Sequence, residues 1–222
     1  ISKDLQSNDT AYLGFCNDQL PIETYLKTLG FKTKYQRSCR PCDLSQLLLE
    51  GKVGAIFTGA AEFGPRALGN RSILASPSDK NAISFINTTI KSREDFRPLA
   101  PITTLEIYQD VFAGCSANNL FDYMLTLANI PLDVIALIPS AVHVDGTGRL
   151  QVLSATQHPF LHQVITDFYR RTGTPALINT SFNQRGEPIV NSLMDALECF
   201  CTTGLDFLCI DSQLLIKSDQ NL

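Results

Sequence analysis

The sequence predicts an α/β fold built on a twisted, mixed β-sheet flanked by helices. Short apolar runs typical of buried strands alternate along the chain with amphipathic runs of helical period. Glycines end several of the helical runs, as they commonly do at helix C-termini. The 222 residues are 44% hydrophobic, so the chain can bury a core without the help of a disulfide or a metal ion.

The first 45 residues are polar and mixed in pattern. One amphipathic run, over residues 22–29, predicts a helix that Gly30 ends. We interpret residues 1–45 as a lead-in or linker, and the chain as a fragment of a longer protein. A compact domain is expected over residues 46–222, where strand and helix patterns alternate.

The elements of this domain follow in chain order. Leucines along one face predict a helix that ends at Gly51, and a buried strand over residues 53–57 leads into a Gly-rich loop over residues 59–69. The later segments are predicted as helices over residues 79–91, 105–112, 159–171 and 192–203, and as strands over residues 99–103, 121–127, 141–144, 150–153, 176–178, 207–210 and 214–217.

Composition excludes several classes of protein. The net charge of −4 and the pI near 5.3 argue against a surface that coats nucleic acid or anionic membrane. No apolar run approaches the roughly 20 residues of a membrane span, and the first residues show no signal-peptide pattern. Seven scattered cysteines fit reduced thiols better than a disulfide framework. We therefore expect a cytoplasmic protein without nucleic-acid or membrane partners.

Positive charge is nevertheless concentrated in one segment. From Gly64 to Arg97, six Lys or Arg residues stand against three acidic residues, a local charge of +3. The segment begins in the Gly-rich loop after a buried strand, and ligands of open α/β sheets bind beyond the C-terminal ends of strands. Glycines let backbone N–H groups approach an anion, and Arg and Lys side chains suit phosphate. The segment predicts a pocket for a phosphorylated small molecule.

Four ordered motifs carry a family resemblance. They are EFGPRALGNRSIL (62–74), KSREDFRPLAP (91–101), VDGTGRLQ (144–151) and NTSFNQRGEPIV (179–190). Together they resemble the C-terminal half of the NodU/TobZ-type O-carbamoyltransferases, over about residues 52–217.

The resemblance implies a fold and a reaction. The fold is a YrdC-like twisted sheet, flanked by helices, around a central cationic cavity. The reaction uses carbamoyl phosphate and ATP, with Mg²⁺, to make carbamoyl-adenylate. An N-terminal half with the actin-like ATPase fold, missing from this chain, would then transfer the carbamoyl group to an acceptor hydroxyl. A homodimer is compatible with the resemblance.

The resemblance also implies site residues, because the YrdC-type signature is a Lys-x-Arg pair that meets a Ser-x-Asn pair. This chain has Lys91 and Arg93, and Ser181 and Asn183. Catalytic roles on phosphate or carbamoyl oxygen are expected for Arg66, Lys91, Arg93 and Arg149. Substrate and nucleotide contacts are expected for Arg71, Arg97, His143, Asn179, Thr180, Ser181 and Asn183.

Several of these residues have alternative interpretations. Arg71 could cap the Gly-rich turn through carbonyl contacts, and Arg97 could pin its loop to the next strand. Arg93 could form a buried ion pair, and His143 could be a hydrogen-bonded core histidine. At the level of function, the alternatives are a threonylcarbamoyl-AMP synthase, or a module that binds nucleotide or carbamoyl phosphate without chemistry.

No metal site is predicted from the remaining motifs. Cys39 and Cys42 have the Cys-x-x-Cys spacing, but no second pair follows at the distance that a zinc site needs. His158 and His162 lie four residues apart on one helix face, but no third ligand is close in the sequence.

Overall fold

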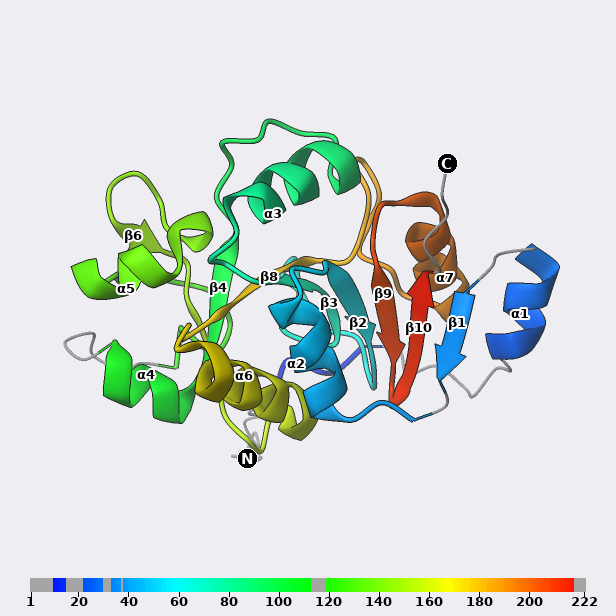
Figure 1. Ribbon diagram of the computed structural model, residues 1–222, viewed down its shortest axis with the longest axis horizontal. Helices are drawn as coiled ribbons and strands as arrows, with labels where there is room; N and C mark the ends of the chain where they lie inside the picture. The colour runs from blue at the N-terminus through cyan, green and yellow to red at the C-terminus, as the bar shows by residue number, and fades with distance from the viewer. Residues whose placement is uncertain (1–9, 15–21, 30–32, 37, 113–118, 218–222) are drawn as a thin grey trace, which may run out of the picture.

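The computed structural model describes residues 10–14, 22–29, 33–36, 38–112 and 119–217. It is an α/β structure with one large mixed sheet and helices on both faces, which confirms the predicted fold class (Figure 1). Among the helices of these residues, none combines the length and apolar character needed to cross a bilayer.

The large sheet has eight strands. Two neighbouring pairs, β2 with β9 and β4 with β7, are parallel, and the other neighbours are antiparallel. The strand order is β1 (Thr33–Gln36), β10 (Gln213–Lys217), β9 (Phe207–Ile210), β2 (Gly54–Phe57), β3 (Arg71–Ala75), β8 (Leu177–Ser181), β4 (Ala100–Thr104) and β7 (Gln151–Leu153). A separate two-stranded sheet joins β5 (Ala128–Asn129) to β6 (Thr147–Gly148).

Helices cover both faces of the sheet and enclose two apolar cores. On one face α2 (Pro41–Leu49) packs side by side with α6 (Pro159–Thr172). The core on the other face includes residues of α1 (Ile22–Leu29), α3 (Lys80–Phe85), the π-helix η1 (Ile86–Ile90), α5 (Leu132–Leu137) and α7 (Leu193–Thr202). The helix α4 (Leu105–Val111) contributes to both cores, and the 3₁₀ turn η2 (Pro139–Ala141) follows α5.

Local sequence signals explain where several helices begin and end. The Ser192 hydroxyl accepts a hydrogen bond from the Asp195 amide while the Asp195 carboxylate accepts one from the Ser192 amide, a complete capping box for α7. The Thr104 hydroxyl caps α4 with a single hydrogen bond, which it accepts from the Ile107 amide. Gly173 ends α6 with a φ of 72°, a conformation that glycine adopts without steric cost.

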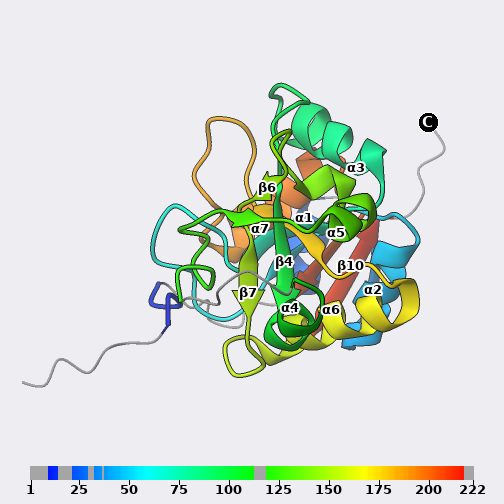
Figure 2. The same cartoon turned by 90° about the vertical axis from the view of Figure 1, so that its left-hand side faces the viewer.

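The strand directions bring several loops to one side of the large sheet, where one set of strand ends lies. We call this row of strand ends the site edge, as distinct from the outer strands β1 and β7. β2, β8 and β9 end there, because β3 runs antiparallel to β2 and β8 and because β9 is parallel to β2. β3, β4, β7 and β10 begin there for the same reason. Figure 2 shows β4 and β7 side by side at the outer part of this sheet. Segments far apart in sequence therefore converge at the site edge.

Some predicted elements are wrong. Residues 121–127 form turns, in which Phe121 and Met124 are buried while Leu125 and Leu127 are exposed. Residues 141–144 continue a 3₁₀ turn into a loop. In both segments, apolar residues that pack individually from a loop mimic the composition of a strand.

The strand β3 was not predicted at all. It is fully buried and central, yet it starts with Arg71 and Ser72, which disguise it as part of the preceding loop. Tertiary context determines this strand, because its polar residues find their partners in neighbouring loops and strands.

The described part of the lead-in belongs to the same structural unit. β1 pairs with β10 at the edge of the sheet, and Ile22 and Leu26 of α1 are buried in the core. The predicted boundary between residues 45 and 46 falls inside α2. The structural unit therefore starts before residue 46, because the lead-in adds an edge strand that pattern alone does not reveal.

Candidate active site

The predicted cations lie in loops that meet at the site edge. Arg66 is in the loop from β2 to β3, Lys91, Arg93 and Arg97 precede β4, and Arg149 precedes β7. Ser181 ends β8, and Asn183 follows it. The topology thus brings together residues from four separate motifs, although they are up to 117 positions apart in the sequence.

Lys91 joins the Lys-x-Arg and Ser-x-Asn pairs directly. Its side chain is buried, and Nζ donates to the Ser181 hydroxyl at 3.1 Å and to the Asn183 carbonyl at 3.0 Å. Nζ also contacts the Ser181 carbonyl and Asn183 Oδ1. The Ser181 hydroxyl donates to Asn183 Oδ1 at 2.7 Å. The ammonium group is therefore held in a fixed position by the end of β8 and the loop after it.

Electrostatics at this position favour an anionic ligand. Burial, and next to it the charge of Arg93, lower the pKa of Lys91 to about 7. Burial, and then the charge of Arg97, also lower the pKa of Arg93. An anion would offset both the desolvation and the repulsion, because it stabilises the charged forms of both groups.

The buried Asn87 organises the loop that carries these cations. Its Nδ2 donates to the carbonyls of Asp95 at 2.9 Å and Arg97 at 2.8 Å, and its Oδ1 accepts from Arg93 Nε at 2.8 Å. Arg93 is thus held by an amide rather than by the buried ion pair of the alternative interpretation. Because the Asn87 amide is neutral, it orients the Arg93 guanidinium without neutralising its positive charge.

The π-helix η1 sets the register of this loop. The Lys91 amide donates to the Ile86 carbonyl at 2.8 Å, five residues back, so the chain leaves the helix with Asn87 and Lys91 both turned into the protein. Such π-turns are frequent at functional sites. Arg97 lies further out, exposed, and its Nε donates to Glu94 Oε2 at 3.0 Å.

The Gly-rich loop is held by Glu62 and Arg71. One oxygen of Glu62 accepts from the amides of Leu68, Asn70 and Arg71, at 2.7, 2.8 and 3.2 Å. The Arg71 side chain is fully buried and donates to the carbonyls of Thr58 and Gly59. Its guanidinium carbon lies 3.9 Å from the centre of the Phe57 ring. These contacts match the alternative in which Arg71 caps the loop, since they direct its guanidinium to the backbone.

Arg66 and Arg149 form a second group of cations. Arg66 is exposed and Arg149 is half-buried. Burial, and then the charge of Arg149, lower the pKa of Arg66, so the two guanidinium groups lie near enough to repel each other. The ion pairs found among the described residues do not involve Arg66, Arg93 or Arg149. An anion bound beside both guanidinium groups would offset their mutual repulsion.

The other predicted binding residues are distributed differently. The buried Asn179 donates to the Ala67 carbonyl at 3.1 Å and to Gln151 Oε1 at 2.7 Å, so it ties the Gly-rich loop to β7 and β8. Strand alternation places Thr180 on the opposite face of β8 from Asn179 and Ser181. His143 is half-buried in the turn before β6, where its Nδ1 lies 3.0 Å from Thr147 Oγ1.

Sequence reasoning missed four residues that shape the site. They are Glu62, Asn87, Gln151 and Arg185. Arg185 Nη1 donates to the Ser92 carbonyl at 2.9 Å and so links the loop after η1 to the loop after β8. Glu62 opens the first motif, and a carboxylate before a run of loop amides is a detectable signal. Asn87 has no comparable signal, because its role depends on the π-turn.

The candidate metal motifs have other roles in the structure. His158 caps α6, with its Nδ1 accepting from the Leu161 amide, and His162 lies 2.8 Å from Glu106. Cys39 is buried and Cys42 is exposed, and both are free thiols. Within the part of the chain that the structure describes, no group of three or more His, Cys, Asp or Glu side chains is placed to hold a metal ion.

Comparison with known proteins gives consistent relatives. The chain is 40% identical to nodulation protein NolNO of Sinorhizobium fredii over 173 residues, which is 78% of this chain and 25% of that protein. It is 39% identical to nodulation protein NolO of Bradyrhizobium diazoefficiens, over 79% of this chain and 32% of that protein. An uncharacterized protein of Synechocystis sp. is 34% identical over 95% of this chain and 37% of its own length.

The chain thus spans between 25% and 37% of the length of these relatives. The sequence model described as "Carbamoyltransferase C-terminus" matches residues 45–217, which include every predicted site residue. A match of this extent identifies the family, and we conclude that the chain belongs to the carbamoyltransferase C-terminus family.

Proposed function

We propose that this chain makes carbamoyl-adenylate from carbamoyl phosphate and ATP. The observation that carries the proposal is the buried Lys91 held by Ser181 and Asn183, beside Arg93 and at the same site edge as the loop that carries Arg66. Together with the YrdC-type Lys-x-Arg and Ser-x-Asn signature and the family membership, this cluster supports acyl-adenylate chemistry and a YrdC-like site around a cationic cavity.

The reaction needs preorganised positive charge. Carbamoyl phosphate and ATP are both polyanions, so the site must first offset their mutual repulsion and then stabilise the charge that develops at the α-phosphorus. In our proposal Lys91 and Arg93 bind the triphosphate, and Arg66 and Arg149 clamp the carbamoyl donor from the second group. The rigid support of Lys91 keeps its charge in place without reorganisation during the reaction.

The donor set of the described residues suits phosphates better than a bare metal ion. Phosphate-bound Mg²⁺ is commonly held through substrate oxygens and one or two carboxylates, so a dedicated cluster of protein ligands is not required. We therefore propose that Mg²⁺ enters with ATP, where it supplies further charge neutralisation. Arg71 and Asn179 act in this scheme as positioning residues that fix the Gly-rich loop.

Transfer of the carbamoyl group to an acceptor hydroxyl is proposed to need the remaining length of the family's longer members. The chain covers at most 37% of the three relatives above. The partner half, the acceptor and cytoplasmic location are therefore parts of the proposal.

The test is carbamoyl-phosphate-dependent release of pyrophosphate from ATP. We expect Lys91→Ala and Arg66→Ala to lower the turnover by about 100-fold or more, because each removes a charge that contacts a transferring group. Lys217→Ala and Arg170→Ala are matched controls, since β10 ends at the opposite edge of the sheet and Arg170 is exposed on α6. We expect both controls to keep the wild-type rate.

Three outcomes contradict the proposal. Unchanged turnover in both site variants would remove the site assignment. Turnover that requires threonine and bicarbonate in place of carbamoyl phosphate would indicate a threonylcarbamoyl-AMP synthase. Tight ATP binding in calorimetry without pyrophosphate release would indicate a binding module.

A further inference from the structure

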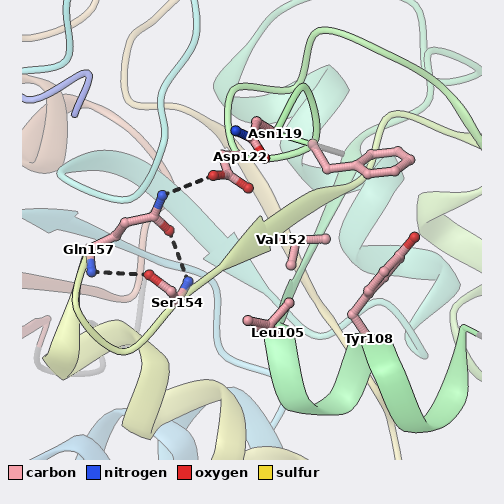
Figure 3. A pocket seen from close by; sticks show the side chains of 8 residues that line it. Leu105, Tyr108, Asn119, Asp122, Val152, Ser154 and Gln157 are labelled. Atoms are coloured by element: carbon pink, nitrogen blue, oxygen red, sulfur yellow. Dashed lines mark hydrogen bonds between the residues drawn. The ribbon is translucent and has the colours of Figure 1, made fainter. Parts of the chain in front are cut away.

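A separate pocket lies away from the cationic site. It has a volume of about 190 Å³ and lies between the start of α4, the outer strand β7 and the segments before and after that strand (Figure 3). Leu105 follows the end of β4 and Ser154 follows the end of β7, so these two lining residues come after strand ends opposite the site edge. Its lining residues are Leu105, Tyr108, Asn119, Phe121, Asp122, Val152, Ser154 and Gln157.

The pocket has one apolar wall and one polar wall. Leu105, Tyr108 and Val152 lie together on one side, and Asp122, Ser154 and Gln157 lie on the other (Figure 3). The polar wall is ordered by its own hydrogen bonds. Gln157 Nε2 donates to Asp122 Oδ2 at 3.2 Å, and Gln157 Oε1 accepts from the Ser154 amide at 2.9 Å.

Asp122 gives the pocket its charge. It is the one carboxyl group among the eight lining residues, which contain no Lys, Arg or His. The carboxyl is half-buried, and its burial raises its pKa. A half-buried carboxylate beside an apolar wall is stabilised by a cation that brings its own hydrocarbon surface.

The size of the pocket limits its occupant. Sites for drug-sized ligands measure roughly 300–1,000 Å³, so a pocket of about 190 Å³ takes a small molecule or one group of a larger one. A second hollow, of about 10 Å³, shares Asp122 and Gln157 with the pocket and has space for about one water molecule. Asp122 and Gln157, which are joined by a hydrogen bond, therefore line both the ligand-sized space and the water-sized one.

We propose that this pocket binds a small organic ammonium ion, with the ammonium on Asp122 and the hydrocarbon against Leu105, Tyr108 and Val152. The proposal is independent of the carbamoyl-adenylate reaction, because none of its residues belongs to the cationic site. It predicts a preference for a protonated amine over a neutral molecule of the same shape.

The experiment uses benzylammonium and benzyl alcohol as matched probes, followed by amide chemical shifts in the ¹⁵N-labelled chain. We expect benzylammonium to shift the amides of Asp122, Val152 and Ser154 saturably, with a dissociation constant on the order of 1 mM. Benzyl alcohol should bind about tenfold more weakly, because it lacks the charge.

Three variants complete the test. Asp122→Asn should lower the affinity for benzylammonium about tenfold and leave the affinity for benzyl alcohol unchanged. Asp110→Asn should change neither affinity, because Asp110 lies on the same helix as Leu105 but does not line the pocket. Asn119→Phe places a ring at the exposed rim and should block both probes. If Asp122→Asn fails to fold, the affinities of the two probes for the wild-type chain and for Asn119→Phe still test the proposal.

The proposal is overturned by equal affinity for the two probes, by full benzylammonium affinity in a folded Asp122→Asn variant, or by the absence of any saturable shift. Unchanged pyrophosphate release in Asp122→Asn is expected in every case, so failure here is distinguishable from failure of the proposed reaction.

Discussion

Lys91 combines two opposing influences on one amine. Four oxygen atoms of Ser181 and Asn183 surround Nζ and favour the ammonium form, whereas burial and Arg93 favour the neutral form. Burial, and then the charge of Arg93, lower the pKa of Lys91 to about 7, well below the ordinary value of 10.5. The protonation state of Lys91 is therefore sensitive to any anion that binds beside it.

The sign of this sensitivity can be worked out. Above pH 7 the folded chain holds Lys91 increasingly neutral, while the unfolded chain stays protonated up to about 10.5. This group therefore makes the free energy of unfolding rise as the pH rises from 7 to 10.5. A bound polyanion raises the pKa of Lys91, so binding near pH 8 takes up a proton.

We expect ATP binding at pH 8 to take up a substantial fraction of a proton in the wild-type chain, and almost none in Lys91→Met. Calorimetry in two buffers of different ionisation enthalpy measures this uptake. Lys217→Met serves as the control, because Lys217 is also partly buried with a lowered pKa but lies at the opposite edge of the sheet. Buffer-independent heats in the wild-type chain would refute the assignment of a titrating Lys91 to the anion site.

At the scale of elements, the Gly-rich loop depends on close packing against α6. Gly69 has a φ of 127°, and a Cβ there would lie 3.0 Å from Leu161 Cδ2 and 3.1 Å from His158 Cδ2. His158 is itself buried as the N-cap of α6. The loop can approach the helix only because position 69 has no side chain.

Gly69→Ala and Gly64→Ala form a matched pair that isolates this packing. Both positions have similar φ values, 127° and 124°, but a Cβ at Gly64 meets nothing within 4 Å. We expect Gly69→Ala to lower the free energy of unfolding by about 1–3 kcal/mol more than Gly64→Ala. Urea unfolding of the two variants measures the difference, and equal losses would show that the contact with α6 does not constrain the loop.

At the scale of the whole molecule, the lead-in supports both the sheet and the site. The Phe63 amide donates to the Ala11 carbonyl at 2.7 Å, and the Tyr12 hydroxyl donates to the Leu68 carbonyl at 3.0 Å, so residues 10–14 brace the Gly-rich loop. β1 covers β10, which would otherwise be an exposed edge.

A chain that starts at Arg40 keeps α2 whole but loses β1 and this brace. We expect its melting temperature to fall by roughly 5 °C or more relative to a chain that starts at Thr10, and we expect it to aggregate more readily. Thermal unfolding followed by circular dichroism, with light scattering, checks both effects. Equal melting temperatures would show that the lead-in is a linker, as its sequence pattern suggests.

Much of the fold was predictable because local patterns agreed with the tertiary structure. The helix α6, predicted over residues 159–171, spans Pro159–Thr172, and the terminal strands β9 and β10 lie where expected. Prediction failed where context overrides pattern. The polar start of β3 and the alternation of β1 become readable only when their neighbours in the sheet are known.

The site divides in the same way. Motif order and residue type identified Lys91, Arg93, Ser181 and Asn183, and the chemistry of those types was sufficient to predict an anion site. The direction of each side chain was not available from the sequence. Arg71 and Arg66 are the same residue type in the same motif, yet Arg71 is buried against backbone carbonyls and Arg66 is exposed. The difference arises because Arg71 is the first residue of the buried strand β3, whereas Arg66 lies in the loop before it.

The sequence by itself determined the family, the α/β class and the cations that we propose for the site. Only the tertiary structure decided which of them meet, because convergence at the site edge follows from strand directions and from the π-turn at η1. The tertiary structure alone also placed Asp122 in a pocket with an apolar wall, since α4, β7 and the segment of Asp122 come together only through packing. The sequence specifies the side-chain types, and the fold sets the distances between them.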